Sequence, residues 1–101
     1  MKLMTKAIEN KLAKYPLYSQ DGKGKDAKVI VKFFYGSFTW YVLEGEKHDN
    51  GDFTFFGIVD SNYGREYGYF TLSQLESVKR FGYPVVERDR YFDAKSVAEI
   101  D

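Results

Sequence analysis

The sequence predicts an α+β protein, with an antiparallel sheet of four to five strands, an N-terminal helix and a second helix packed on the sheet. Phe, Tyr and Trp make up 19% of the 101 residues, and aromatic side chains suit the pleated, half-buried surface of a sheet. Four largely apolar runs follow one another between residues 28 and 71, each with the length of a strand. A chain of this size supports one modest core, so we expect residues 1–101 to form a single domain.

The first predicted helix lies near the N-terminus. Thr5 is a typical N-cap residue. Apolar side chains recur around it at three- and four-residue steps, at Met4, Ile8, Leu12 and Tyr15. The helix must end before Pro16, because the residue before a proline is pushed out of the α region. A polar loop that contains glycine is then expected over residues 18–27.

The four apolar runs are predicted to be consecutive strands. Segment 28–36 alternates, as does segment 38–45, and segment 65–71 is predicted to be the fourth strand, after the turn at residues 61–64. In the first of them one face carries Val29, Val31, Phe33 and Tyr35 and the other carries Lys32. Segment 53–60 is almost continuously apolar, which is typical of an interior strand covered on both faces.

A second helix is predicted after the fourth strand. Ser73 and Glu76 have the spacing of a capping box, and Gly82 suits the left-handed position just past a helix end. The side chains expected to face inward are Leu75, Val78 and Phe81. A short edge strand is predicted over Pro84 to Glu87, and a last helical turn over residues 94–100.

The polar segment between the second and third strands predicts a hairpin turn, because Asn50-Gly51 lies between two apolar runs. The same segment holds the only histidine of the chain. If the strands pair, Glu44 and Asp52 approach from the two sides, with His48 and Asp49 between them. Imidazole nitrogen and carboxylate oxygen are both ligands that zinc accepts.

The hairpin is therefore a candidate site for one divalent metal ion, zinc, completed by water or a neighbouring molecule. Its predicted ligands are Glu44, His48, Asp49 and Asp52. The alternative is that the loop is polar only because such residues solvate and turn well. Asp60, Glu66 and Glu87 are further candidates if the fold brings them near. A calcium loop fits worse, since Gly57 falls where the bidentate glutamate should be.

Composition excludes several classes of protein. The chain has no cysteine, which excludes disulfides and thiolate zinc sites and is typical of a reducing compartment. The N-terminal segment has no apolar run as long as that of a signal peptide, and no segment is apolar enough to span a bilayer. We therefore expect a soluble, cytoplasmic protein with no membrane partner.

The formal net charge is zero, but the charges are unevenly distributed. Residues 1–32 hold eight lysines and three acidic residues, a net charge of +5, and residues 33–101 carry a net charge of −5. Binding DNA through its phosphates depends on many basic contacts, so we expect no direct sequence-specific DNA binding. The separation of charge either orients a protein partner or only reflects a solvated, lysine-rich helix and loop.

No catalytic constellation is found in the sequence. His48 is the only histidine and no G-x-S-x-G motif accompanies it, which argues against a Ser-His-Asp hydrolase. Segment 22–28 lacks the spacing of a phosphate-binding loop. Glu87 and Asp89 alternate with arginines, as expected of a salt-bridged edge. We predict that the chain is not an enzyme.

Aromatic side chains left outside the core are candidates for a binding surface. The predicted partner-binding residues are Tyr35, Trp40, Tyr41, Tyr67 and Tyr69. Together with Phe55 they could instead stack the bases of single-stranded nucleic acid. A basic flank for such a platform would consist of Lys23, Lys25, Lys28 and Lys32. The alternatives are that these rings mainly fill the core or serve a protein interface.

Several runs of the sequence together carry a resemblance to a known family. They are F-T-W-Y-V-L-E-G (38–45), G-D-F-T-F-F-G-I-V-D (51–60), E-Y-G-Y-F-T-L-S-Q-L-E (66–76) and P-V-V-E-R-D-R-Y-F (84–92). Over nearly its full length, the chain resembles a domain-of-unknown-function family of the DUF 2958 type. The members of this family are small proteins carried by plasmids, conjugative elements and phages. The resemblance implies an accessory protein of a mobile genetic element and brings no catalytic residues. The loop before G-D-F-T-F-F departs from such relatives, which usually have no histidine there.

The resemblance and the lack of catalytic chemistry together predict an anti-defence protein. Its role would be similar to that of an anti-CRISPR inhibitor: it would bind a host CRISPR effector nuclease, such as Cas9, in the bacterial cytoplasm. Binding would block DNA loading or activation of the nuclease. If the metal site exists, this inhibition would depend on zinc. The alternative is a single-stranded nucleic-acid-binding accessory protein of a mobile element.

Overall fold

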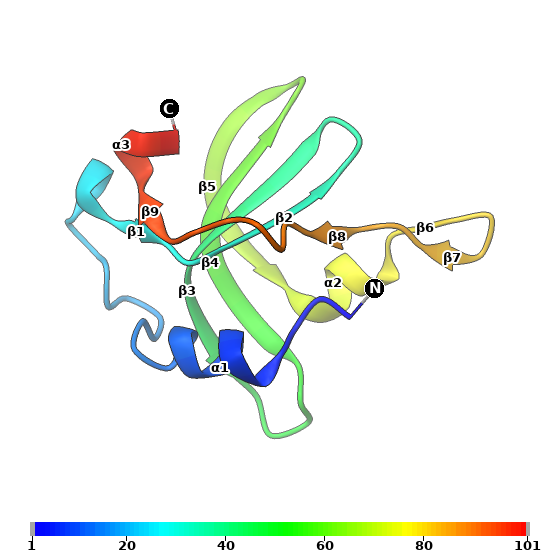
Figure 1. The fold of residues 1–101 in the computed structure, drawn as a ribbon, viewed down its shortest axis with the longest axis horizontal. Helices are drawn as coiled ribbons and strands as arrows, with labels where there is room; N and C mark the ends of the chain where they lie inside the picture. Colours follow the sequence, from blue (N-terminus) through cyan, green and yellow to red (C-terminus); the bar gives the residue numbers. More distant parts are fainter. Residues whose placement is uncertain (1, 101) are drawn as a thin grey trace.

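The computed structural model describes residues 2–100. A single antiparallel sheet dominates the fold, with strand order β5-β4-β3-β2-β8 (Figure 1). Its strands are β2 (Val31–Tyr35), β3 (Phe38–Lys47), β4 (Phe53–Ser61), β5 (Gly64–Thr71) and β8 (Glu87–Arg88). Strands β2 to β5 form a meander, and β8 returns to pair with β2. The predicted α+β class and the predicted antiparallel sheet of four to five strands are confirmed, and the sheet has five.

Short elements surround this sheet. The helices are α1 (Lys6–Leu12), the 3-10 helix η1 (Gly24–Asp26), α2 (Leu72–Ser77) and α3 (Val97–Ile100). Two small antiparallel pairs join β1 (Lys28–Val29) to β9 (Lys95–Ser96) and β6 (Lys79–Arg80) to β7 (Tyr83–Pro84). Within residues 2–100, no helix has the length and hydrophobicity needed to cross a membrane.

The two main helices begin at side-chain caps. The hydroxyl oxygen of Thr5 accepts a hydrogen bond from the backbone N–H of Ile8 (3.2 Å), as predicted for α1. At α2, Thr71 accepts from the N–H of Gln74 (3.1 Å), and the Gln74 side chain accepts from the N–H of Thr71 (2.9 Å). This capping box lies two residues earlier than the predicted one, which began at Ser73. The reason is that β5 runs directly into the helix, so its last residue becomes the cap.

The segment after α2 does not continue as a helix, contrary to the prediction. Helix α2 ends at Ser77, and residues 79–84 form a hairpin in which Arg80 pairs with Tyr83. Phe81 and Gly82 make its two-residue turn with φ values of +54° and +81°, the left-handed conformation that such tight hairpins require. Phe81 is therefore exposed, although it was predicted to face inward. The edge strand, predicted over residues 84–87, is β8 at residues 87–88.

The sheet has a hydrophobic core on each face. The main core, under α1 and α2, consists of Leu3, Met4, Leu12, Ile30, Val31, Phe33, Val42, Phe53, Phe55, Phe70, Leu72, Leu75 and Val86. The second core lies on the other face near α3 and consists of Ala27, Val29, Leu43, Ile58 and Val97. Strand β4 contributes Phe55 to the first and Ile58 to the second, so segment 53–60 is the interior strand that its continuous hydrophobicity predicted.

The predicted strand over residues 28–36 is broken at Ile30. Strand β1 ends at Val29 and pairs with β9, and β2 begins at Val31. Between them, the N–H of Ile30 donates to the carbonyl oxygen of Val42 (2.8 Å). Val29 lies in the second core while Ile30 and Val31 lie in the main core, so the chain changes layers at this point.

A β-bulge interrupts the pairing of β3 with β4. Val42 lies opposite Gly57 and Glu44 lies opposite Phe56, so Leu43 is an extra residue on β3. Because strand residues alternate between faces, Glu44 shares the face of Phe56, and Leu43 packs in the second core on that same face. The bulge therefore directs two consecutive side chains to one side of the sheet.

Candidate functional site

The predicted hairpin turn at Asn50-Gly51 is present. Strands β3 and β4 remain paired as far as Lys47 and Phe53, which leaves a five-residue loop, residues 48–52. The N–H of Gly51 donates to the carbonyl oxygen of His48 (3.0 Å), and the N–H of His48 donates to that of Asp52 (2.8 Å). Gly51 has φ +90°, a conformation in which glycine carries no steric penalty.

The hairpin separates the predicted metal ligands. Glu44 lies opposite Phe56, so the prediction that Glu44 and Asp52 face each other is wrong. The reason is that β3 continues for three residues beyond Glu44 before the loop begins. Throughout residues 2–100, no group of three or more His, Asp or Glu side chains lies close enough together to hold a metal ion. The zinc site stays a prediction.

Glu44 is instead part of a buried polar network. Its side chain is 1% exposed, and its two carboxylate oxygens accept hydrogen bonds from the backbone N–H groups of Tyr18 (2.7 Å) and Gln20 (2.8 Å). The Gln20 amide donates to the carbonyl oxygens of Lys28 (2.8 Å) and Leu43 (2.7 Å) and accepts from the N–H of Lys28 (2.6 Å). These bonds fix the loop after α1 to strand β3.

Asp52 and His48 also have partners within the fold. Asp52 accepts hydrogen bonds from the backbone N–H (3.0 Å) and the hydroxyl group (2.8 Å) of Ser73, and from the N–H of Phe53 (2.8 Å). The bonds from Ser73 first, and that from Phe53, hold the pKa of Asp52 below its ordinary value. His48 Nε2 lies 2.6 Å from the hydroxyl oxygen of Thr54. Asp52 thus attaches the hairpin to helix α2.

The structure divides the predicted partner-binding aromatic residues between the two faces of the sheet. Tyr35 and Trp40 pack, partly buried, against the main core, and Tyr41 packs against the second core. Tyr67 and Tyr69 lie on the outer strand β5, and each is 55% exposed. Neighbouring residues of a strand point to opposite faces, so Trp40 and Tyr41 do not share a surface. Phe55, proposed for base stacking, is fully buried.

Tyr67 and Tyr69 belong to a group of rings on the second face, which we call the aromatic cluster: Tyr18, Phe56, Tyr67 and Tyr69. The ring centroid of Phe56 lies 6.0 Å from that of Tyr67 and 5.0 Å from that of Tyr69. A hydrogen bond with Tyr18 raises the pKa of Tyr69, and the negative charges of Asp21 and Glu44 raise it further. Burial contributes to this shift as well, and the two carboxylates lie near enough to the cluster to add to it.

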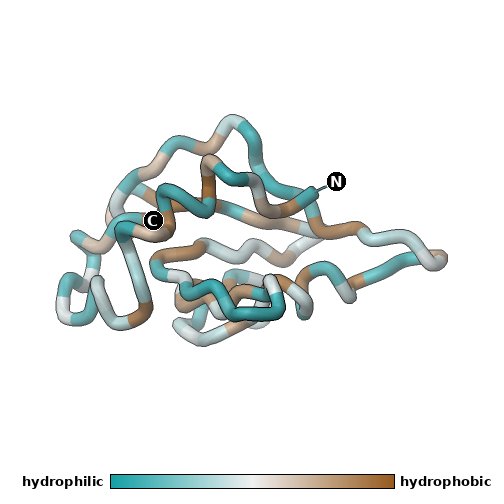
Figure 2. Tube along the Cα trace, turned by 90° about the horizontal axis from the view of Figure 1, so that it is seen from below, coloured by the Kyte–Doolittle hydropathy of each residue, from teal (hydrophilic) through white to brown (hydrophobic). Residues whose placement is uncertain are grey.

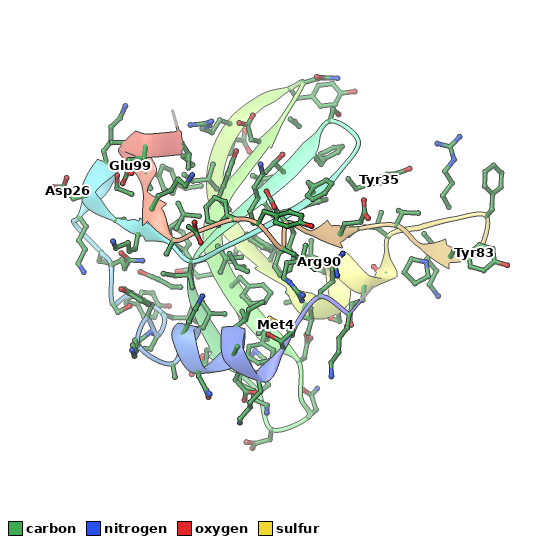
Figure 3. All side chains as sticks on the ribbon, viewed as in Figure 1. Met4, Asp26, Tyr35, Tyr83, Arg90 and Glu99 are labelled. Atoms are coloured by element: carbon green, nitrogen blue, oxygen red, sulfur yellow. The ribbon has the colours of Figure 1, made fainter. Side chains whose placement is uncertain are left out.

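A second exposed aromatic feature, which sequence reasoning missed, is the hairpin of residues 79–84, which we call the β6–β7 arm. It projects from the body of the molecule both in the ribbon of Figure 1 and in the Cα tube of Figure 2, which is turned by 90°. Phe81 at its turn is 86% exposed and Tyr83 is 72% exposed; Figure 3 shows Tyr83 at the outer end. The Arg80 guanidinium lies 5.3 Å from the centroid of the Phe81 ring. The sequence feature that could have indicated this hairpin is the Phe81-Gly82 pair, because it lies between Arg80 and Tyr83, which pair across the turn.

An open hollow of about 440 Å³ lies beside the edge strand β8. Its charged lining residues are Lys32, Glu87, Arg88, Asp89 and Arg90. Lys32 Nζ lies 3.8 Å from an Asp89 oxygen, and Arg88 donates to the carbonyl oxygens of Lys2 (2.8 Å) and Leu3 (3.0 Å). Acidic and basic groups alternate here, as the E-R-D-R run predicted, and they serve to hold the N-terminal segment and the edge strand together.

Comparison with known proteins identifies one family. The family described as "Protein of unknown function (DUF2958)" matches residues 3–99. Neither the curated proteins nor the solved structures give a match. The match covers almost the whole chain, including the sheet, both main helices and the β6–β7 arm. The chain therefore belongs to the DUF2958 family, as its sequence motifs predicted.

Proposed function

We propose that this chain is a non-catalytic anti-defence protein that binds a host CRISPR effector nuclease and blocks its DNA loading or activation. The observation that carries the protein-binding part of the proposal is the β6–β7 arm, because it presents two exposed rings and an arginine away from the body of the molecule. Aromatic residues and arginine dominate the binding energy of protein interfaces. The choice of a CRISPR nuclease as partner rests on the resemblance to proteins of mobile elements.

The conformation of Phe81 supports a role in binding. A left-handed backbone costs an ordinary L-residue roughly 1–2 kcal/mol, and at φ +54° Phe81 also leaves its ring in water. The ring contributes nothing to either core. Strained residues of this kind cluster at ligand-binding and partner-binding positions. A partner with an apolar pocket would give the ring the burial that its own fold does not.

A single-stranded nucleic-acid-binding role is the second candidate, because Lys79 and Arg80 flank the same exposed rings. Basic side chains beside aromatic rings are the means by which such proteins track a strand and stack its bases. The arm supplies only these two cations, however. Phosphate-driven affinity grows with the number of basic contacts, so we favour a protein partner.

Co-elution with an effector tests the proposal. The chain is mixed with guide-loaded Cas9 and passed over a size-exclusion column, and cleavage of target DNA is measured in parallel. We expect co-elution and loss of cleavage. Replacing an interface hot-spot residue costs 2 kcal/mol or more, so Phe81→Asn should weaken binding roughly thirtyfold. The matched control is Tyr63→Asn, which removes a ring of similar exposure at the β4–β5 turn.

Two other outcomes would replace the proposal. A gel shift of a single-stranded oligonucleotide that falls steeply with salt, without nuclease binding, would establish the second candidate. Turnover of a substrate by the purified chain would establish an enzyme. Failure of the parent chain to bind the nuclease would refute the proposal. Equal nuclease binding by the Phe81 and Tyr63 variants would show that the arm is not a docking element.

If inhibition depends on zinc, the predicted ligands that are left to hold the ion are His48 and Asp49. Glu44 and Asp52 already accept hydrogen bonds from the backbone and from Ser73. Elemental analysis of the purified protein, beside a His48→Ala variant, decides the matter. We expect zinc in the parent and loss of zinc in the variant if His48 is a ligand. Equal metal content in the two proteins would remove it.

A further inference from the structure

A small open pocket of about 180 Å³ lies on the second face of the sheet, beside the aromatic cluster. It forms where the loop that carries Gln20 folds over strands β3, β4 and β5. Its lining includes Gln20, Asp21, Glu44, Phe56 and Tyr67. At the β-bulge, Glu44 points toward the loop that it anchors.

The charged side chains that line this pocket are both carboxylates. Asp21 and Glu44 are its charged lining residues, and no lysine or arginine within residues 2–100 lines it. Asp21 is exposed to solvent, whereas Glu44 is buried behind it with both oxygens bonded to backbone N–H groups. Both carboxylates also contribute to the raised pKa of the neighbouring Tyr69, after the larger effects of Tyr18 and of burial.

Aromatic rings form the apolar part of the lining. The Phe56 and Tyr67 rings are nearly parallel, with an interplanar angle of 18°. Carboxylates beside aromatic rings are the combination that attracts organic cations, through charge and through the negative face of the ring. A metal ion would need three or more donor side chains, and the described part of the chain groups no such set. The pocket therefore suits an organic cation.

We propose that this pocket receives the guanidinium group of an arginine side chain presented by the protein partner. This assignment rests on the proposed function, and it names the chemistry by which the partner is recognised. Guanidinium is the preferred cation because it is planar, stacks on aromatic faces and donates hydrogen bonds to carboxylates in fixed directions. Proteins that load DNA line their channels with such side chains, so an arginine from the nuclease channel fits both requirements.

The pocket can be tested with a defined probe. The full-length ¹⁵N-labelled chain is titrated with N-acetyl-arginine amide, and the neutral isostere N-acetyl-citrulline amide serves as the control ligand. We expect saturable amide shifts at Asp21, Phe56 and Tyr67, with a Kd on the order of 10 mM, and little response to citrulline. Asp21→Asn and Tyr67→Ser should each weaken binding about threefold. Tyr63→Ser should bind like the parent.

Each result decides the inference. Equal response to both ligands, shifts scattered over the acidic surface, or no response at ~100 mM arginine would overturn it. The pocket and the proposed function can fail separately. If arginine binds locally but Cas9 does not co-elute, the pocket stands and the nuclease partner is wrong. If Cas9 binds the Asp21 and Tyr67 variants as well as the parent, the proposed function stands and the role of the pocket in partner binding is wrong.

Discussion

At the scale of single residues, Phe81 shows a conflict between local stability and exposure. Its left-handed φ of +54° is tolerated better by asparagine or glycine than by a bulky side chain. We expect Phe81→Asn to raise the free energy of unfolding by about 0.5–1 kcal/mol, as measured by urea denaturation. Tyr83→Asn, on the adjacent strand, should bring no such gain. A lower stability of the Phe81 variant would mean that the ring packs in the folded monomer after all.

Asp52 gives a pH-dependent contribution to stability. Hydrogen bonds from Ser73 and Phe53 lower its pKa in the folded state from 3.8. A carboxyl group with a lowered folded-state pKa stabilises the fold above its unfolded pKa, and this contribution disappears as the pH falls through the folded value. We expect Asp52→Asn to lower the melting temperature at pH 7, with the difference from the parent shrinking below about pH 4. A difference that stays constant from pH 7 to pH 3 would contradict this.

At the scale of secondary-structure elements, the close approach of β3 and β4 at the bulge requires glycine. A Cβ atom on Gly57 would lie 1.9 Å from the carbonyl oxygen of Tyr41. We expect Gly57→Ala to destabilise the protein by about 3 kcal/mol or more, since the backbone must move. The control is Gly68→Ala, directly across on β5, where a Cβ atom meets nothing within 4 Å. Similar melting temperatures for the two variants would show that the backbone at the bulge can shift with little loss of stability.

Elements with strong periodicity could be predicted from the sequence. The strands of the meander and the cap at Thr5 follow from alternation and capping chemistry alone. The break at Ile30 could not be predicted, because every residue from Val29 to Val31 is apolar and the change of layers depends on pairing with the distant strand β9. The β6–β7 arm was missed because a capping pattern followed by glycine also fits a longer helix.

The candidate sites could be predicted only in part. Tyr67 and Tyr69 were found by residue type, and they are exposed. The division of the other rings between faces depends on a register that the sequence does not fix. Glu44 appeared as a metal ligand because it is close in sequence to His48. Its true partners, Tyr18 and Gln20, lie 26 and 24 residues away and are backbone groups, which leave no side-chain signal.

At the scale of the whole molecule, Glu44 joins the N-terminal third of the chain to the sheet. Glutamine at this position replaces one acceptor oxygen by an amide group that would face a backbone N–H. Leaving a buried donor without an acceptor costs about 1–3 kcal/mol, so we expect Glu44→Gln to lower stability by that amount in urea denaturation. Hydrogen exchange should also rise at Tyr18 and Gln20. Glu46→Gln, two residues along the strand and exposed, is the control and should change neither measurement.

The central strands of the sheet have a hydrophobic core on each side. The main core holds α1 and α2, and the second core holds the C-terminal elements. Exposed aromatic rings lie in the aromatic cluster beside β5, on the β6–β7 arm, at Tyr63 in the β4–β5 turn and at Tyr91 after β8. The first two of these regions differ in charge: carboxylates lie beside the aromatic cluster, and the β6–β7 arm carries Lys79 and Arg80.

The extra residue at Leu43 adds one side chain to the second core without changing the register of the hairpin beyond it. If Leu43 were deleted, Val42, Glu44 and Gly45 would lie opposite Gly57, Phe56 and Phe55 in regular alternation, so Glu44 and Gly45 would keep their sides. Gly45 would still face the main core, where a Cβ atom would lie 3.3–3.6 Å from side-chain atoms of Leu12 and Phe55. A chain without this one residue could therefore build the same hairpin, and it would lack only the contribution of Leu43 to the second core.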